Sequence, residues 1–153
     1  MSFRGIPIKV ATFDPETGEP TGNFETAGFA TLRRCPALGG LLKLVVAAGA
    51  AEDRAGRLAV LAHRALFAAE TPEAVESAAA VYGKAAEESE LATQALGGAV
   101  HDFVVAGFVG AGYSPDEAER YASRVGTERM QELKGACLVG SGRLDFTKAP
   151  AAA

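Results

Sequence analysis

Apolar and polar side chains alternate with a period of two along the first part of the chain. Ile6, Ile8 and Val10 occupy alternate positions, and a second alternating stretch covers residues 24–32. This period is typical of strands, whose successive side chains point to opposite faces. The intervening residues 14–23 are rich in Pro and Gly, which favour turns. We therefore expect a β-hairpin with a long polar tip.

Pro7 lies inside the first of these predicted strands. Proline has no backbone N–H to donate to a neighbouring strand, so we expect this strand at the edge of its sheet. A hairpin of two strands is only marginally stable in water. It should therefore pack on the rest of the chain, join another strand, or pair with a partner chain by strand addition.

Beyond Pro36 the apolar positions recur at helical spacing. We expect helices to end at Gly49 and at Gly97-Gly98, because glycine favours breaks in a helical pattern. The segment Ser114-Pro115-Asp116-Glu117 has the spacing of a capping box and begins the last helix. The expected helices cover 36–49, 52–70, 71–96, 99–112 and 114–135, followed by a short extended piece at 143–146. The sequence thus predicts an α+β fold, mainly α, with an N-terminal β-hairpin followed by a compact bundle of about five helices.

The length of 153 residues fits a single domain with small appendages. A hydrophobic content of 48% excludes wholesale disorder. We expect residues 1–34 to form the hairpin, residues 35–148 the helical body, and residues 149–153 a flexible tail.

Two segments carry apolar side chains that should be buried, either inside this chain or against a partner. Residues 103–115 carry no charge, and this run is shorter than the roughly 20 residues that a membrane span needs. It is therefore a buried helix or an oligomer interface. The helix expected at 52–70 carries apolar residues on two sides, so it should be buried on both. The interface residues that we expect are Phe103, Val104, Phe108, Leu58, Val60 and Phe67.

Composition and net charge indicate which kinds of partner the protein can bind. Alanine makes up about a fifth of the chain, and small side chains bury little area each, which favours an oligomer; a GC-rich genome would give the same composition. The net charge of −4 gives no general attraction for nucleic acid.

Residues 1–10 lack the apolar run of a secretory signal, so we expect a cytoplasmic protein. Cys35 and Cys137 lie too far apart in sequence for a cysteine zinc motif and are expected to be reduced thiols.

Sequence motifs for catalysis are sparse. The glycine pairs at 110–112 and 140–142 lack the lysine and the spacing of phosphate-binding loops. The order of His63, His101, Asp102 and Asp145 resembles the metal-ligand order of the HD phosphohydrolase superfamily, an all-helical fold. That resemblance implies a divalent metal held by these four side chains, which would activate a water against a phosphate ester. The sequence departs from that family after Asp102, where apolar residues replace a stretch with glycine and lysine.

The order of elements resembles that of another group of proteins. A β-hairpin leads into Leu32–Pro36, a capped helix begins at Ser114, and the segment 138–142 closes the helical part. This layout resembles minor structural and tail-assembly chaperone proteins of tailed bacteriophages. The resemblance implies a role in assembly and a virion-associated location, and it assigns no role to individual residues.

Two principal hypotheses follow. The first is a non-enzymatic assembly or structural protein, without a cofactor, which forms homo-oligomers and contacts other protein chains. The alternative is a small helical metal-dependent phosphohydrolase of HD type. A helical domain that binds a small ligand in an apolar pocket is a third possibility, because such pockets leave little trace in one sequence.

Overall fold

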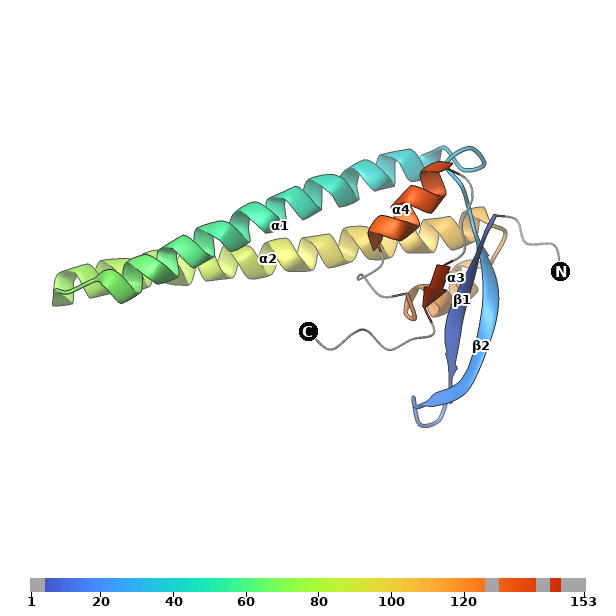
Figure 1. The fold of residues 1–153 in the computed structure, drawn as a ribbon, viewed down its shortest axis with the longest axis horizontal. Helices are drawn as coiled ribbons and strands as arrows, with labels where there is room; N and C mark the ends of the chain where they lie inside the picture. The colour runs from blue at the N-terminus through green and yellow to red at the C-terminus, as the bar shows by residue number, and fades with distance from the viewer. Residues whose placement is uncertain (1–4, 126–129, 140–143, 147–153) are drawn as a thin grey trace. The chain divides into compact units, whose positions relative to one another are not determined.

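The computed structural model describes residues 5–125, 130–139 and 144–146 (Figure 1). The elements, in chain order, are β1 (Ile6–Phe13), β2 (Pro20–Phe29), α1 (Ala37–Ala68), α2 (Pro72–Gly110), α3 (Pro115–Ala122), α4 (Met130–Val139) and β3 (Leu144–Phe146). This order confirms an α+β chain, mainly α, that begins with a β-hairpin. The tail expected at 149–153 lies outside the described residues.

The chain divides into two compact units. One unit is residues 43–99, which we call the helical hairpin because it consists of the adjoining parts of α1 and α2. The other, the strand-bearing unit, comprises the described residues up to Leu42 and from Val100 onward. The β-hairpin therefore shares a unit with α3 and α4.

Four helices occur in the described part of the chain, where about five were expected. Helix α1 continues through Gly49, and α2 continues through Gly97-Gly98, so that each unites two predicted helices. A glycine in a helix costs only about 1 kcal/mol relative to alanine, which a long packed helix can offset. The last predicted helix is instead split, because α3 ends at Ala122 and α4 begins at Met130.

The sheet has the order β2-β1-β3, so the prediction that β1 lies at an edge is wrong. β1 pairs with β2 in the antiparallel sense and with β3 in the parallel sense. Pro7 lies opposite Gly28, whose N–H points to the hydroxyl of Tyr113 at 3.0 Å instead of to β1. On the other side, the pairing with β3 begins only at Ile8. Pro7 therefore removes no hydrogen bond from the ladder between β1 and β2.

The hairpin tip is shorter than predicted. Strand β2 begins at Pro20, which pairs with Phe13, so only residues 14–19 form the tip. The amide of Gly18 donates to the carbonyl of Asp14 at 2.8 Å, and the amide of Asp14 donates to the carbonyl of Glu19 at 2.9 Å. These bonds close a tight turn over residues that the sequence pattern assigned to a longer loop.

The core of the strand-bearing unit joins the sheet to the end of α2. Phe29 is fully buried and contacts the rings of Phe103 and Phe108, with centroids 5.8 and 5.3 Å away. The amide of Ala30 donates to the carbonyl of Gly107 at 2.9 Å. The core residues that β1, α1 and α4 contribute to this unit are Ile6, Ile8, Val10, Leu38, Met130, Leu133, Ala136 and Cys137.

Two glycines are required where α2 meets the sheet and ends. A Cβ atom at Gly107 would overlap the ring of Phe29, so only glycine permits this approach. Gly112 has φ +110°, a conformation that side-chain-bearing residues rarely adopt. Next to it, the amide of Tyr113 donates to the carbonyl of Phe108 at 3.3 Å and closes the last turn of α2.

In the helical hairpin, α1 and α2 are antiparallel (Figure 1). Alanine recurs at every seventh position along the inner side of both arms, and each of these alanines is buried or half-buried. They are Ala48, Ala55, Ala62 and Ala69 in the first arm and Ala78, Ala85, Ala92 and Ala99 in the second. A seven-residue repeat is typical of coiled coils, and alanine lets the helices approach closely. No helix among the described residues is long and apolar enough to cross a membrane.

Candidate interaction surface

Large apolar side chains lie on the outside of the helical hairpin. Phe67 is 79% exposed, and Leu58, Val60 and Leu91 are each more than half exposed. The full set is Leu44, Val46, Leu58, Val60, Leu61, Phe67, Val75, Val81 and Leu91. Within residues 43–99 only Val45 and Ala62 are buried. Soluble monomers rarely expose large continuous apolar patches, and such patches commonly mark sites of protein contact.

The exposed apolar residues fall on two sides of the helical hairpin. Helical geometry turns the chain by about 100° per residue, so Leu58 lies on the side of α1 opposite to both Gly56 and Val60. Gly56 and Val60 line an open groove together with Thr93 of α2. Leu91, two residues from Thr93, lies on the side of α2 away from that groove.

We call the two sides the groove face and the apolar face. The groove face carries Val46, Val60 and Phe67, which are spaced by fourteen and seven residues. The apolar face carries Leu44, Leu58, Val81 and Leu91. Leu61 lies between the two faces and also lines the groove.

The groove itself is shallow and encloses about 610 Å³. Its lining includes Glu52 and Ser89, and an ion pair joins Arg57 to Asp53 at 3.2 Å beside it. Both side chains of this pair are about 70% exposed, so the pair contributes little to stability. No polar or charged residue is buried in the described part of the chain.

The two arms of the helical hairpin differ in charge. In residues 43–68 there are four basic side chains, Lys43, Arg54, Arg57 and Arg64, against two acidic ones. In residues 72–99 there are five acidic side chains, Glu73, Glu76, Glu87, Glu88 and Glu90, against Lys84 alone. One arm is therefore net basic and the other net acidic.

The predicted interface residues separate into two groups in the structure. Phe103, Val104 and Phe108 are buried in the core of the strand-bearing unit and are not available to a partner. Elsewhere in the same uncharged run, Val109 is 42% exposed, and residues 111–114 follow the end of α2. Leu58, Val60 and Phe67 are exposed on the helical hairpin, on the faces described above.

The four residues of the phosphohydrolase hypothesis do not form a described metal site. The ring of His63 contacts Phe67 and Tyr82, at centroid distances of 4.8 and 5.3 Å. In the other unit, Nε2 of His101 lies 2.8 Å from Oε2 of Glu119. Asp102 is exposed on α2, and Asp145 belongs to β3, where only the backbone is described. Among the described residues, no group of three or more His, Cys, Asp or Glu side chains could hold a metal ion.

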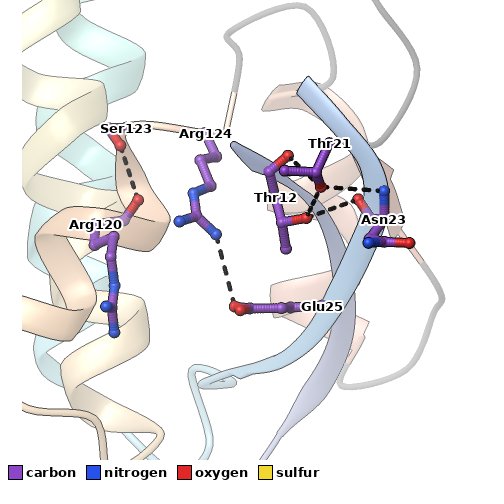
Figure 2. Close-up of polar contacts among 7 residues, drawn as sticks. All are labelled: Thr12, Thr21, Asn23, Glu25, Arg120, Ser123 and Arg124. Atoms are coloured by element: carbon purple, nitrogen blue, oxygen red, sulfur yellow. Dashed lines mark hydrogen bonds and ion pairs between the residues drawn. The ribbon is translucent and has the colours of Figure 1, made fainter. Parts of the chain in front are cut away.

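A polar contact that the sequence did not reveal joins the end of α3 to strand β2. Figure 2 shows Arg124 and Glu25 pointing toward each other, with Nη1 of Arg124 at 3.6 Å from Oε2 of Glu25. The Arg124 side chain is only 14% exposed. Burial and the nearby Glu25 carboxylate raise the pKa of Tyr121 above its ordinary value. These residues are about a hundred positions apart, so no local pattern indicates the contact.

Both cysteines are free thiols in the strand-bearing unit. Cys137 is buried, and its Sγ donates to the carbonyl of Ala30 at 3.5 Å. Burial raises the pKa of the Cys137 thiol, which makes it a poor nucleophile at neutral pH. Cys35 is half-buried and lies close to Gly110. Cys137 therefore has the environment of a core residue.

Comparison with known proteins adds no assignment, because no protein family, curated protein or solved structure matches the chain.

Proposed function

We propose that this protein is a non-enzymatic assembly protein that acts through protein–protein contacts made by the helical hairpin. One observation carries this proposal: large apolar side chains such as Phe67, Leu58 and Leu91 lie on the outside of a unit that buries almost none of its own. Exposed apolar area gains roughly 25 cal/mol per Å² when it leaves water. Contact with another chain would supply the burial that the helical hairpin lacks.

The packing inside the helical hairpin supports the same proposal. Its inner side is formed mainly by alanines, which contribute little hydrophobic stabilisation. Most of its larger apolar residues are exposed, whereas Val45 is buried and Leu66 and Leu96 are half-buried. This distribution suits helices whose stability is completed by a partner.

We further propose that the assembly belongs to a tailed bacteriophage, in which this chain acts as a minor structural or tail-assembly protein. The support is the layout in which strands precede the helices, together with helices that expose apolar faces. Under this proposal the protein is found with the virion or its assembly intermediates.

Site-specific photo-crosslinking in the native host tests the proposed function. A photoreactive residue at Phe67 or at Leu91 should give covalent adducts with protein chains, which mass spectrometry then identifies. The matched control carries the same residue at Thr17 in the polar hairpin tip, which is also exposed. Adducts from the helical hairpin but not from the tip support the proposal. Equal labelling at all three positions, or no protein adducts, would refute it.

A further inference from the structure

The apolar face of the helical hairpin has the size, charge and spacing to receive a second copy of the same face. We propose that two copies of this chain pair through Leu44, Leu58, Val81 and Leu91 to form a four-helix bundle. In this pair the two tips lie at the same end, and α1 of each copy packs against α2 of the other. This inference rests on the proposed function and names its partner.

Contacts between the two arms show which residues lie at the same height along the helices. Within the helical hairpin His63 contacts Tyr82, and a Cβ atom at Gly49 would contact Leu96. A residue of α1 and a residue of α2 therefore lie at the same height when their numbers add to about 145. On this scale Leu58 falls between the levels of Leu91 and Val81. When α1 meets a second copy's α2 with the tips together, Leu58 lies four residues from the level of Leu91 and six from that of Val81, about 6 and 9 Å along the axis.

The charges of the two arms favour pairing with the tips together. The arm formed by α1 is net basic, and the arm formed by α2 is net acidic. Pairing with the tips together sets each basic arm against an acidic one, whereas pairing with the tips apart sets basic against basic. Arg54 lies three residues from the level of Glu88, about 4.5 Å along the axis. Both side chains are exposed, so each is available to pair across the interface.

The apolar face is large enough for a stable interface. Residues 43–68 span about 40 Å as a helix, and two adjacent helices are about 20 Å wide. One face of the helical hairpin therefore offers on the order of 800 Å², which is the contribution of one partner to a stable interface. A two-fold axis parallel to the helices repeats the Leu58 and Arg54 contacts in both copies, as a closed dimer requires.

Light scattering of the purified full chain after size exclusion tests the pairing. The expected mass is twice the chain mass of 15.7 kDa. Leu58→Asp should give a monomer, because it buries an unpaired carboxylate in the interface. Val60→Asp is the matched control: it is equally exposed, lies on the groove face, and should leave the dimer intact. Circular dichroism verifies that both variants keep their helices.

Charge exchange tests the specific pairing of Arg54 with Glu88. Arg54→Glu and Glu88→Arg should each weaken dimerisation roughly tenfold, because each sets like charges against each other. The double variant Arg54→Glu/Glu88→Arg should restore the wild-type dissociation constant. Failure of the double variant to recover would overturn this pairing.

A fluorescent label at the tip tests the relative direction of the two copies. Glu70→Cys labelled with pyrene should show excimer emission in the dimer, because the tips lie together. With the tips apart the labels would be separated by the length of the helices, and no excimer would form. A monomeric wild-type chain, or a dimer broken by Val60→Asp but not by Leu58→Asp, would overturn the inference. If such a monomer still gave crosslinks to a different protein in the host, the proposed function would stand without it.

Discussion

At the residue scale, Gly107 decides how closely α2 approaches the sheet. The ring of Phe29 occupies the space that a Cβ atom would need, and the adjacent carbonyl accepts the amide of Ala30 at 2.9 Å. A larger residue must push the ring or the helix away, and with them the contacts of Phe29 with Phe103 and Phe108. The packing of Phe29 against Phe103 and Phe108 therefore requires that residue 107 has no Cβ atom.

We expect Gly107→Ala to lower the free energy of unfolding by about 1–3 kcal/mol, the usual cost of overpacking a core. Gly98→Ala, in the same helix, is the control, because a Cβ atom there would meet nothing within 4 Å. This control should raise stability by up to about 1 kcal/mol through helix propensity alone. Urea unfolding of the two variants measures both effects, and an equal response would contradict the tight contact.

At the element scale, Tyr121 and Arg124 tie α3 and the residues after it to strand β2. Burial and the Glu25 carboxylate raise the pKa of Tyr121 above 10.0, so the folded protein favours the neutral phenol. The unfolded chain loses this proton first as the pH rises. The stabilising contribution is therefore present below about pH 10 and is lost as the pH rises through the folded pKa.

We expect Tyr121→Phe to reduce the loss of stability that the wild type shows between about pH 9.5 and 11. Urea unfolding across this range is the measurement. Tyr82→Phe is a suitable control, since Tyr82 lies in the helical hairpin against His63, in the other unit. If Tyr121→Phe retained the full wild-type pH dependence, the contact with Glu25 would not be responsible for it.

Also at the element scale, features with local signals were predictable from the sequence. The β-hairpin was predicted from its alternation, and the start of α3 from its capping box, in which the Ser114 hydroxyl accepts the amide of Glu117 at 3.2 Å. The helix ends at Gly49 and Gly97-Gly98 were wrongly predicted, because the glycine cost is small in long helices. The pairing of β3 with β1 joins distant segments, and no periodicity carries that information.

The candidate surface was predictable only in part. The apolar residues on two sides of 52–70 predicted a helix buried on both sides, whereas Leu58, Val60 and Phe67 are exposed in this chain. The uncharged run at 103–115 could not be assigned in the same way, because an apolar run looks alike whether its own chain or a partner covers it. The seven-residue alanine spacing was present in the sequence, but it became meaningful only when burial showed which positions face inward.

At the scale of the whole molecule, the core of one unit and the exposed faces of the other are separate features. The phenylalanine core lies entirely in the strand-bearing unit, and the apolar face lies entirely in residues 43–99. Since a heptad is nearly two turns, removing seven residues from a helix preserves the side on which later residues lie. The helical hairpin can therefore be shortened in matched steps.

We expect deletion of residues 52–58 together with 87–93 to leave the strand-bearing unit folded and to abolish dimerisation. These two heptads lie level with each other, and they contain Leu58, Glu88 and Leu91. Circular dichroism should show less helix with a retained cooperative transition, and light scattering should give a monomer. Deletion of 52–58 alone is the contrast, because it leaves the two arms unequal and should lower stability. A persistent dimer after the matched deletion would place the contact elsewhere.

The division of the chain also sets an order of events during synthesis. Phe29 leaves the ribosome about 74 residues before Phe103, the ring against which it packs, and β3 follows later still. At a synthesis rate of roughly 5–20 residues per second, Phe103 is therefore made about 4–15 s after Phe29. During that interval the helical hairpin, whose contacts are local, has time to form first. The length of α1 and α2 thus sets how long the strands of the nascent chain remain without their packing partner. Each added pair of heptads would lengthen that time.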